Sequence, residues 1–68
     1  MKPYTFYLHE ARREAPSFQF VRCEDDDHAR SFAHMLFGER PSLVEVEVFD
    51  GRCSRFRVGP PEVEQHAH

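Results

Sequence analysis

The sequence contains no tryptophan, only three glycines and no apolar run close to the length of a membrane span. A helix that crosses a bilayer needs about 20 predominantly apolar residues, so no membrane helix is predicted. The first residues, Met1-Lys2-Pro3-Tyr4, also lack the apolar segment of a signal peptide. Together these absences predict a cytoplasmic protein without a membrane partner.

A surplus of basic residues is missing as well. Nine Lys and Arg residues stand against twelve Asp and Glu residues, which gives a formal charge of −3. The two signs are interspersed along the chain. Proteins that bind nucleic acid usually concentrate positive charge on one face. The composition therefore argues against a nucleic-acid partner.

Cysteine is scarce, with Cys23 and Cys53 as its two positions. Structural zinc sites usually combine two closely spaced ligand pairs, and neither cysteine has a second one nearby in the sequence. In a reducing compartment both are expected to be free thiols, and a disulfide stays open if their strands are neighbours. Cys23 precedes a predicted helix start, which can lower the pKa of a thiol.

Sequence motifs of catalysis are also absent. The chain has no glycine-rich phosphate loop, no G-x-S-x-G nucleophile turn and no dinucleotide fingerprint. A chain of 68 residues leaves little volume for a substrate pocket. The sequence therefore predicts a protein that is not an enzyme and has no cofactor, metal site or small-molecule substrate.

The residues that are present predict a small folded domain. Apolar residues make up 40% of the chain and charged residues 31%, which are globular proportions. Alternating runs at 4–9 and 18–22 predict a hairpin, with residues 9–16 as the connecting loop. The side chains expected to face the core are Tyr4, Phe6, Leu8, Phe18 and Phe20.

A helix is predicted over residues 25–37. Asp25-Asp26-Asp27 places carboxylates where the first N–H groups of a helix lack partners, and Asp26 is spaced to pair with Arg30. Gly38 is expected at the left-handed position after the helix, and Pro41 prevents continuation. The residues that form one apolar stripe are Ala29, Phe32, Ala33 and Leu36.

Two further alternating runs, 43–49 and 53–58, flank the turn signal Asp50-Gly51 and predict a second hairpin. Residues directly opposite in a hairpin share a face, so a two-residue loop would place arginines among the valines. A three-residue loop or a bulge keeps the apolar side chains together and is predicted instead. The inward side chains are then Val44, Val46, Val48, Ser54, Phe56 and Val58.

The elements in the order β-β-α-β-β predict an α+β domain over residues 1–59, followed by a disordered tail over residues 60–68. A single helix would pack on one face of a four-stranded, mainly antiparallel sheet. The sequence leaves the strand order open. We expect residues 4–9 and one strand of the second hairpin to lie at the centre.

The strand Pro3-Tyr4-Thr5-Phe6-Tyr7-Leu8 is followed by an acidic helix start, at Asp25 to Leu36, and by a strand pair around Asp-Gly, at Val44 to Val58. This arrangement resembles small uncharacterised bacterial single-domain proteins of the same element order. The chain departs from them after the first strand, where His9-Glu10-Ala11 replaces an Asp-Gly pair. The resemblance implies the fold and, because those proteins have no assigned function, no chemistry.

The sheet face without a helix is predicted to carry the function. Its apolar content exceeds what a solvated face requires, and exposed apolar patches often mark interfaces. We predict a protein-interaction module or homodimer that uses this face or an edge strand, against a plain solvated face with Glu–Arg pairs. The predicted contact residues are Tyr7, Val21, Phe49, Cys53, Arg55 and Arg57, beside Thr5, Gln19, Glu45 and Glu47.

Two alternative functions come from other classes. A single-stranded nucleic-acid binder would stack bases on Tyr7 and Phe49 beside Arg55 and Arg57. A small metal-binding or thiol-active protein would instead use the soft and borderline ligands of the chain. The residues of that second alternative are Cys23, His28 and Cys53.

Overall fold

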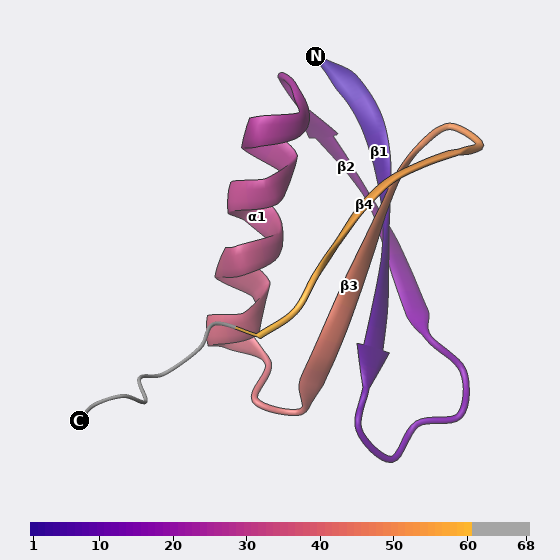
Figure 1. Ribbon diagram of the computed structural model, residues 1–68, viewed down its shortest axis with the longest axis vertical. Coiled ribbons are helices and arrows are strands. Elements are labelled where there is room, and N and C mark those ends of the chain that lie inside the picture. Colours follow the sequence, from indigo (N-terminus) through magenta and orange to yellow (C-terminus); the bar gives the residue numbers. More distant parts are fainter. Residues whose placement is uncertain (61–68) are drawn as a thin grey trace.

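Residues 1–60 are described by the computed structural model, in which a helix lies against an antiparallel sheet (Figure 1). The elements are β1 (Lys2–Glu10), β2 (Ser17–Cys23), α1 (Asp26–Glu39), β3 (Leu43–Asp50) and β4 (Cys53–Val58). The strand order is β2-β1-β3-β4, so β1 and β3 are central and β2 and β4 are the edges. The predicted α+β class and element order are confirmed. The predicted tail, except Pro60, lies outside the described residues.

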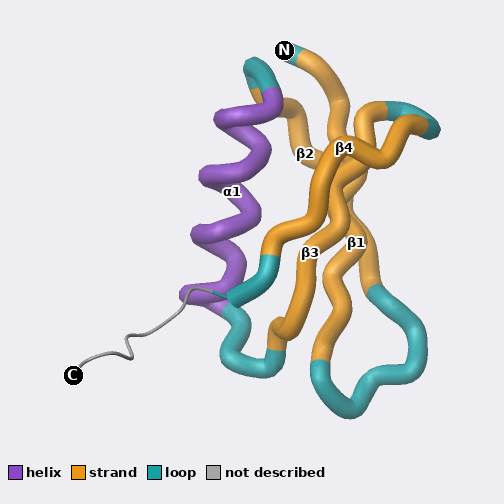
Figure 2. The backbone as a smooth tube through the Cα atoms, in the orientation of Figure 1, coloured by secondary structure: helices purple, strands orange, loops and turns teal. Residues whose placement is uncertain are grey.

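The core lies between α1 and one face of the sheet (Figure 2). β1 supplies three of its largest side chains because every second residue of a strand points to the same face. The ring of Phe6 packs edge-on against Phe32 of the helix, with centroids 5.3 Å apart. The buried residues are Tyr4, Phe6, Leu8, Cys23, Ala29, Ala33, Leu36, Leu43, Val46, Val48 and Val58.

The helix begins as predicted and ends later. Asp25 is the N-cap, and its Oδ1 accepts a 2.9 Å hydrogen bond from the backbone N–H of His28. Gly38 lies inside the helix, so its predicted left-handed position after the helix is wrong. The helix ends at Glu39. Its C-cap residue, Arg40, is extended (φ −127°, ψ 96°) because the proline that follows disfavours helical backbone before it.

The side chains of β2 face the opposite way from the prediction. Thr5 pairs with Phe20 and Tyr7 with Phe18, and directly opposite residues share a face. Phe18 and Phe20 therefore lie on the open face, 58% and 72% exposed, instead of in the core. The cause lies at the end of the strand. Cys23 is buried where the chain leaves the sheet for the helix. Because alternate residues of a strand share a face, the other odd-numbered residues of β2 also face the helix.

The second hairpin turns through a two-residue loop, Gly51 and Arg52, between the paired residues Asp50 and Cys53. Gly51 has φ +64°, a conformation that glycine adopts at little cost. A positive φ at the first of two loop residues is typical of a type II′ turn. The predicted three-residue loop is therefore not formed. The alternative prediction, a bulge, is confirmed.

That bulge lies in β4 at Arg55. Val48 pairs with Phe56 whereas Phe49 pairs with Ser54, so Arg55 has no partner in β3. After the bulge, Val48 and Phe56 share the helix side as predicted. Before the bulge the alternation is reversed, so Ser54 lies on the open face and its predicted inward position is wrong.

A second irregularity, at the start of β3, changes which side chains there face the core. His9 pairs with Glu45 and Glu10 pairs with Leu43, so Val44 has no partner in β1. The extra residue moves Leu43 into the core and leaves Val44 48% exposed. The predicted inward position of Val44 is therefore wrong.

Candidate interaction face

The open face of the sheet carries two cross-strand rows of side chains. The first row, from β2 to β4, contains Phe20, Thr5, Phe49 and Ser54. The second row contains Phe18, Tyr7, Glu47 and Arg57. Residues directly opposite on neighbouring strands share a face, so both rows point away from α1. The four rings in them, Tyr7, Phe18, Phe20 and Phe49, are called the aromatic cluster below.

The aromatic cluster is continuous across β2, β1 and β3. The ring of Tyr7 lies 5.3 Å from that of Phe49 and 6.1 Å from that of Phe18. Phe18 in turn lies 5.6 Å from Phe20, at an interplanar angle of 71°. Tilted and edge-on ring pairs contribute about 0.5–1.5 kcal/mol beyond the burial of area. The rings therefore hold one another in place while their outer surfaces stay in water.

The β4 side of the same face is polar. Nε of Arg57 lies 3.4 Å from a carboxylate oxygen of Glu47, and its Nη1 lies 3.9 Å from Glu45. Nε2 of His9 lies 3.2 Å from the other oxygen of Glu47. The guanidinium of Arg57 is thus already occupied by carboxylates of its own face.

Arg22 lies at the far corner of the open face from this acidic group. It pairs with Pro3 on β1, and it follows Phe20 at the next outward position of β2. Its side chain is exposed, and within residues 1–60 it forms no ion pair. The face therefore carries a free positive charge at one end and two carboxylates at the other.

Half of the predicted contact residues lie on this face, namely Tyr7, Phe49 and Arg57. Four residues predicted for it lie on the helix side instead: Gln19, Val21, Cys53 and Arg55. Gln19 and Val21 pair with buried residues of β1, and Cys53 pairs with Asp50, which lies opposite Tyr4. Phe18 and Phe20 were missed as face residues. The signal for them is Cys23, a small apolar residue just before the helix start.

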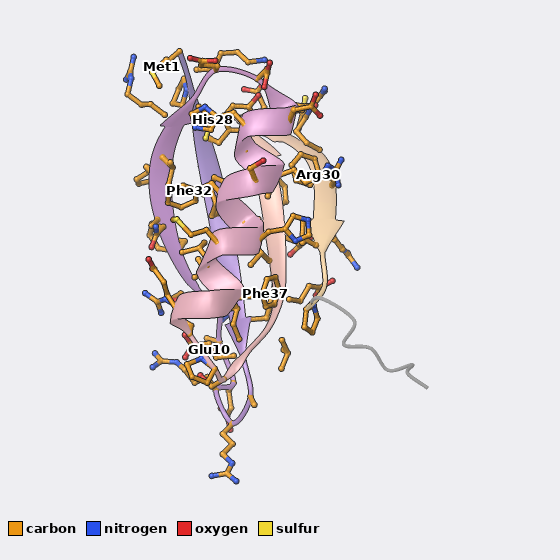
Figure 3. The ribbon with its side chains drawn as sticks, turned by 90° about the vertical axis from the view of Figure 1, so that its left-hand side faces the viewer. Met1, Glu10, His28, Arg30, Phe32 and Phe37 are labelled. Atoms are coloured by element: carbon orange, nitrogen blue, oxygen red, sulfur yellow. The ribbon has the colours of Figure 1, made fainter. Side chains whose placement is uncertain are left out.

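The β4 bulge directs Arg55 to the N-terminus of α1. Its Nη2 lies 2.7 Å from Oδ2 of Asp26, and the hydroxyl of Tyr4 donates a 2.8 Å bond to Oδ1. The Arg55 guanidinium, and then the Tyr4 hydroxyl, lower the pKa of Asp26. The predicted Asp26–Arg30 pair is therefore replaced. Arg30 lies over the ring of Phe56, 4.2 Å from guanidinium carbon to centroid, on the β4 side of the helix (Figure 3).

The two cysteines are free thiols on opposite edges of the sheet. Neighbouring strands are about 4.8 Å apart, and two strands separate Cys23 from Cys53, whereas a disulfide needs Cα atoms within about 7 Å. Burial, and then the carboxylate of Asp25, raises the pKa of the Cys23 thiol. This shift is opposite to the one predicted from the helix start, and it disfavours the nucleophilic thiolate.

The alternative metal site would require Cys23, His28 and Cys53 to meet. Within residues 1–60, no three His, Cys, Asp or Glu side chains gather so that they could hold a metal ion. Nδ1 of His28 accepts a 3.0 Å hydrogen bond from the backbone N–H of Glu24, so its ring joins the residue before the N-cap to the first turn of the helix. The same part of the chain contains no pocket.

In the described part of the chain, no helix is long and apolar enough to cross a membrane. No family model, curated protein or solved structure matches the chain. The resemblance to small bacterial proteins therefore stays a prediction.

Proposed function

We propose that this protein is a non-enzymatic interaction module that binds a protein partner through the aromatic cluster of its open sheet face. The observation that carries the proposal is the exposure of Phe18 and Phe20 beside the rings of Tyr7 and Phe49. None of these four rings is needed to cover α1, because all of them point away from it. They form an apolar surface that a partner can cover.

The energetics of such a contact favour binding. Burying a large apolar side chain fully contributes about 1.5–3 kcal/mol. Because the rings already pack on one another, a partner does not have to order flexible side chains, which otherwise weakens association. Aromatic residues and arginine are also enriched among the side chains that dominate binding energy at protein interfaces.

Single-stranded nucleic acid is the second candidate, because Tyr7 and Phe49 lie side by side on the two central strands, where bases could stack. The surrounding charges oppose it. Arg57 is held by two glutamates, and Arg55 lies on the helix side with an aspartate. Phosphates approaching the rings would meet carboxylates on the β4 side, so a protein partner is the better fit.

The proposal also places the protein in a reducing compartment such as the cytoplasm. The supporting observation is that Cys23 and Cys53 are both free thiols. Disulfides persist in oxidising compartments and are rare in the cytosol.

The proposal is tested by affinity capture from the native cell with wild type, Phe20→Glu and Met35→Glu. Phe20 is exposed on the open face, whereas Met35 is exposed on α1, so the two substitutions change charge equally on opposite sides of the molecule. We expect Phe20→Glu alone to lose the captured protein, with circular dichroism showing that all three chains are folded. Equal capture by all three would refute the proposal.

A further inference from the structure

We infer that the partner is a second copy of this chain, and that two copies pack open face to open face about a two-fold axis through the aromatic cluster. The inference rests on the proposed function, since it names the occupant of the same surface. The arrangement of charges on the face carries it, and the size of the face sets the expected strength of the dimer.

The charges of the open face suit a copy of itself. Arg22 lies at one end of the face, next to Phe20 on the β2 edge. Glu45 and Glu47 lie toward the other end, on β3, where Arg57 offsets one of their two charges. The aromatic cluster lies between these two ends and is itself uncharged. The positive and negative ends are therefore separated along a diagonal, with the apolar contact area in the middle.

A two-fold axis makes use of this diagonal. In an isologous interface, a residue i of one copy contacts residue j of the other, and j contacts i. When the axis passes through the aromatic cluster, the rings of the two copies meet, and Arg22 of each copy lies toward Glu45 of the other. Arg22 has no ion pair within residues 1–60. In the dimer it would pair with Glu45 of the other copy, which gives two such ion pairs per dimer.

The size of the face predicts a weak dimer. Four strands at about 4.8 Å each and six or seven residues at about 3.4 Å each give a footprint of roughly 400 Å² per copy. Counted for both copies, the footprint is only about 800 Å², in the range of weak and transient contacts. We therefore expect reversible dimerisation with a Kd in the micromolar range.

Pairing through the edge strands fits the observations less well. Strand addition along β2 or β4 would satisfy backbone groups at the sheet edge. It would leave Phe18 and Phe20 in water and Arg22 without a carboxylate. Face-to-face packing covers the rings and pairs the charge in one contact.

The test is sedimentation equilibrium of the full chain, from about 1 µM to about 1 mM, for wild type and charge-reversal variants. Arg22→Glu and Glu45→Arg are each expected to weaken dimerisation about tenfold, because every substitution acts twice in a symmetric dimer. The double variant restores the ion pair in reversed order and is expected to dimerise like wild type. Glu39→Arg, an equal charge change on α1, is the control and leaves the Kd unchanged.

Recovery in the double variant supports the two-fold arrangement, provided that Phe20→Glu also abolishes the dimer. If neither charge reversal changes the Kd of the dimer, the two-fold arrangement is overturned. A strict monomer at all concentrations overturns the inference. If that monomer still captures a protein through Phe20, the proposed function survives. Salt-sensitive binding of mixed oligonucleotides by a monomer that captures no protein would overturn both.

Discussion

The hydroxyl of Tyr4 donates a 2.8 Å hydrogen bond to Oδ1 of Asp26 and thereby joins the first strand to the first turn of the helix. The other oxygen of the same carboxylate is held by Arg55 at the β4 bulge. One carboxylate thus connects β1, α1 and β4 at the N-terminal end of the helix. Burial, and then the bond to Asp26, raises the pKa of the Tyr4 hydroxyl.

Tyr4→Phe isolates the contribution of this hydrogen bond, since the ring stays in the core while the donor is lost. We expect the midpoint of thermal unfolding to fall by about 4–8 °C, the size expected when a domain of this length loses one hydrogen bond. Tyr7→Phe on the open face is the control and should leave the midpoint unchanged. Equal midpoints for wild type and Tyr4→Phe would show that the bond contributes nothing.

The lowered pKa of Asp26 makes part of the stability depend on pH. Pairing of a carboxylate whose pKa is lower in the folded state stabilises the fold above the ordinary Asp value, about 3.9. This stabilisation is lost as the pH falls through the lower, folded-state value. Asp26→Asn should therefore lower the urea midpoint near neutral pH, and the difference from wild type should shrink below about pH 4.

The control for this prediction is Asp27→Asn, in the same turn of the helix. Asp27 forms no ion pair within residues 1–60, so its substitution should show no such convergence with wild type in acid. A constant gap between wild type and Asp26→Asn at every pH would contradict the role assigned to the Arg55 pair.

The opposite placements of Phe6 and Phe20 predict very different losses of stability on substitution by alanine. Phe6 is fully buried, and Phe6→Ala should cost about 3–5 kcal/mol, comparable to what a core of this size supplies. Phe20 is largely exposed, and Phe20→Ala should cost less than about 1 kcal/mol. Urea unfolding of both variants below the concentration of dimerisation separates them. A large loss for Phe20→Ala would place its ring back in the core.

The orientation of the β2 side chains could not be predicted from the sequence. Period-two alternation predicts correctly that residues 17–23 form a strand, but it does not tell which alternate set faces the core. The alternation, taken with the more apolar set inward, predicts Phe18 and Phe20 in the core. The face is decided by pairing with β1 and by the crossing at Cys23, which are tertiary relationships.

More of the second hairpin could be predicted, because the alternating valines of one strand and the alternating arginines of the other restrict how the two strands can pair. Valines and arginines cannot share a face, and that condition requires either a three-residue loop or the bulge that the structure contains. Its location at Arg55 could not be inferred, since the partner that holds this side chain, Asp26, lies 29 positions away in the sequence. Half of the candidate site was predicted correctly for the same reason. Tyr7 and Phe49 lie on central strands, and Arg57 follows the bulge of β4, so the alternation places all three correctly. Val21 depends on the β2 crossing, and Cys53 and Arg55 depend on the bulge.

The two thiols should differ in reactivity. Cys53 is exposed, whereas Cys23 is buried and has a raised thiol pKa. In the folded protein a thiol reagent should modify one cysteine rapidly and the other only on unfolding, because the thiolate is the reacting species. Cys53→Ser should remove the rapid phase and leave the slow one. Two rapid phases in the folded wild type would contradict the burial of Cys23.

The position of Gly38 can be decided by the sign of one stability change. At Gly38 the backbone is helical, and an added Cβ would meet nothing within 4 Å, so Gly38→Ala should stabilise the fold by about 1 kcal/mol through helix propensity. At Gly51 the φ of +64° disfavours a side chain, so Gly51→Ala should destabilise it by about 1–2 kcal/mol. Urea unfolding of both variants measures the two changes under the same conditions. If Gly38 occupied the left-handed position after the helix, as the sequence pattern predicts, both substitutions would be destabilising. Opposite signs therefore require that the helix continues through residue 38 and ends where Pro41 stops it.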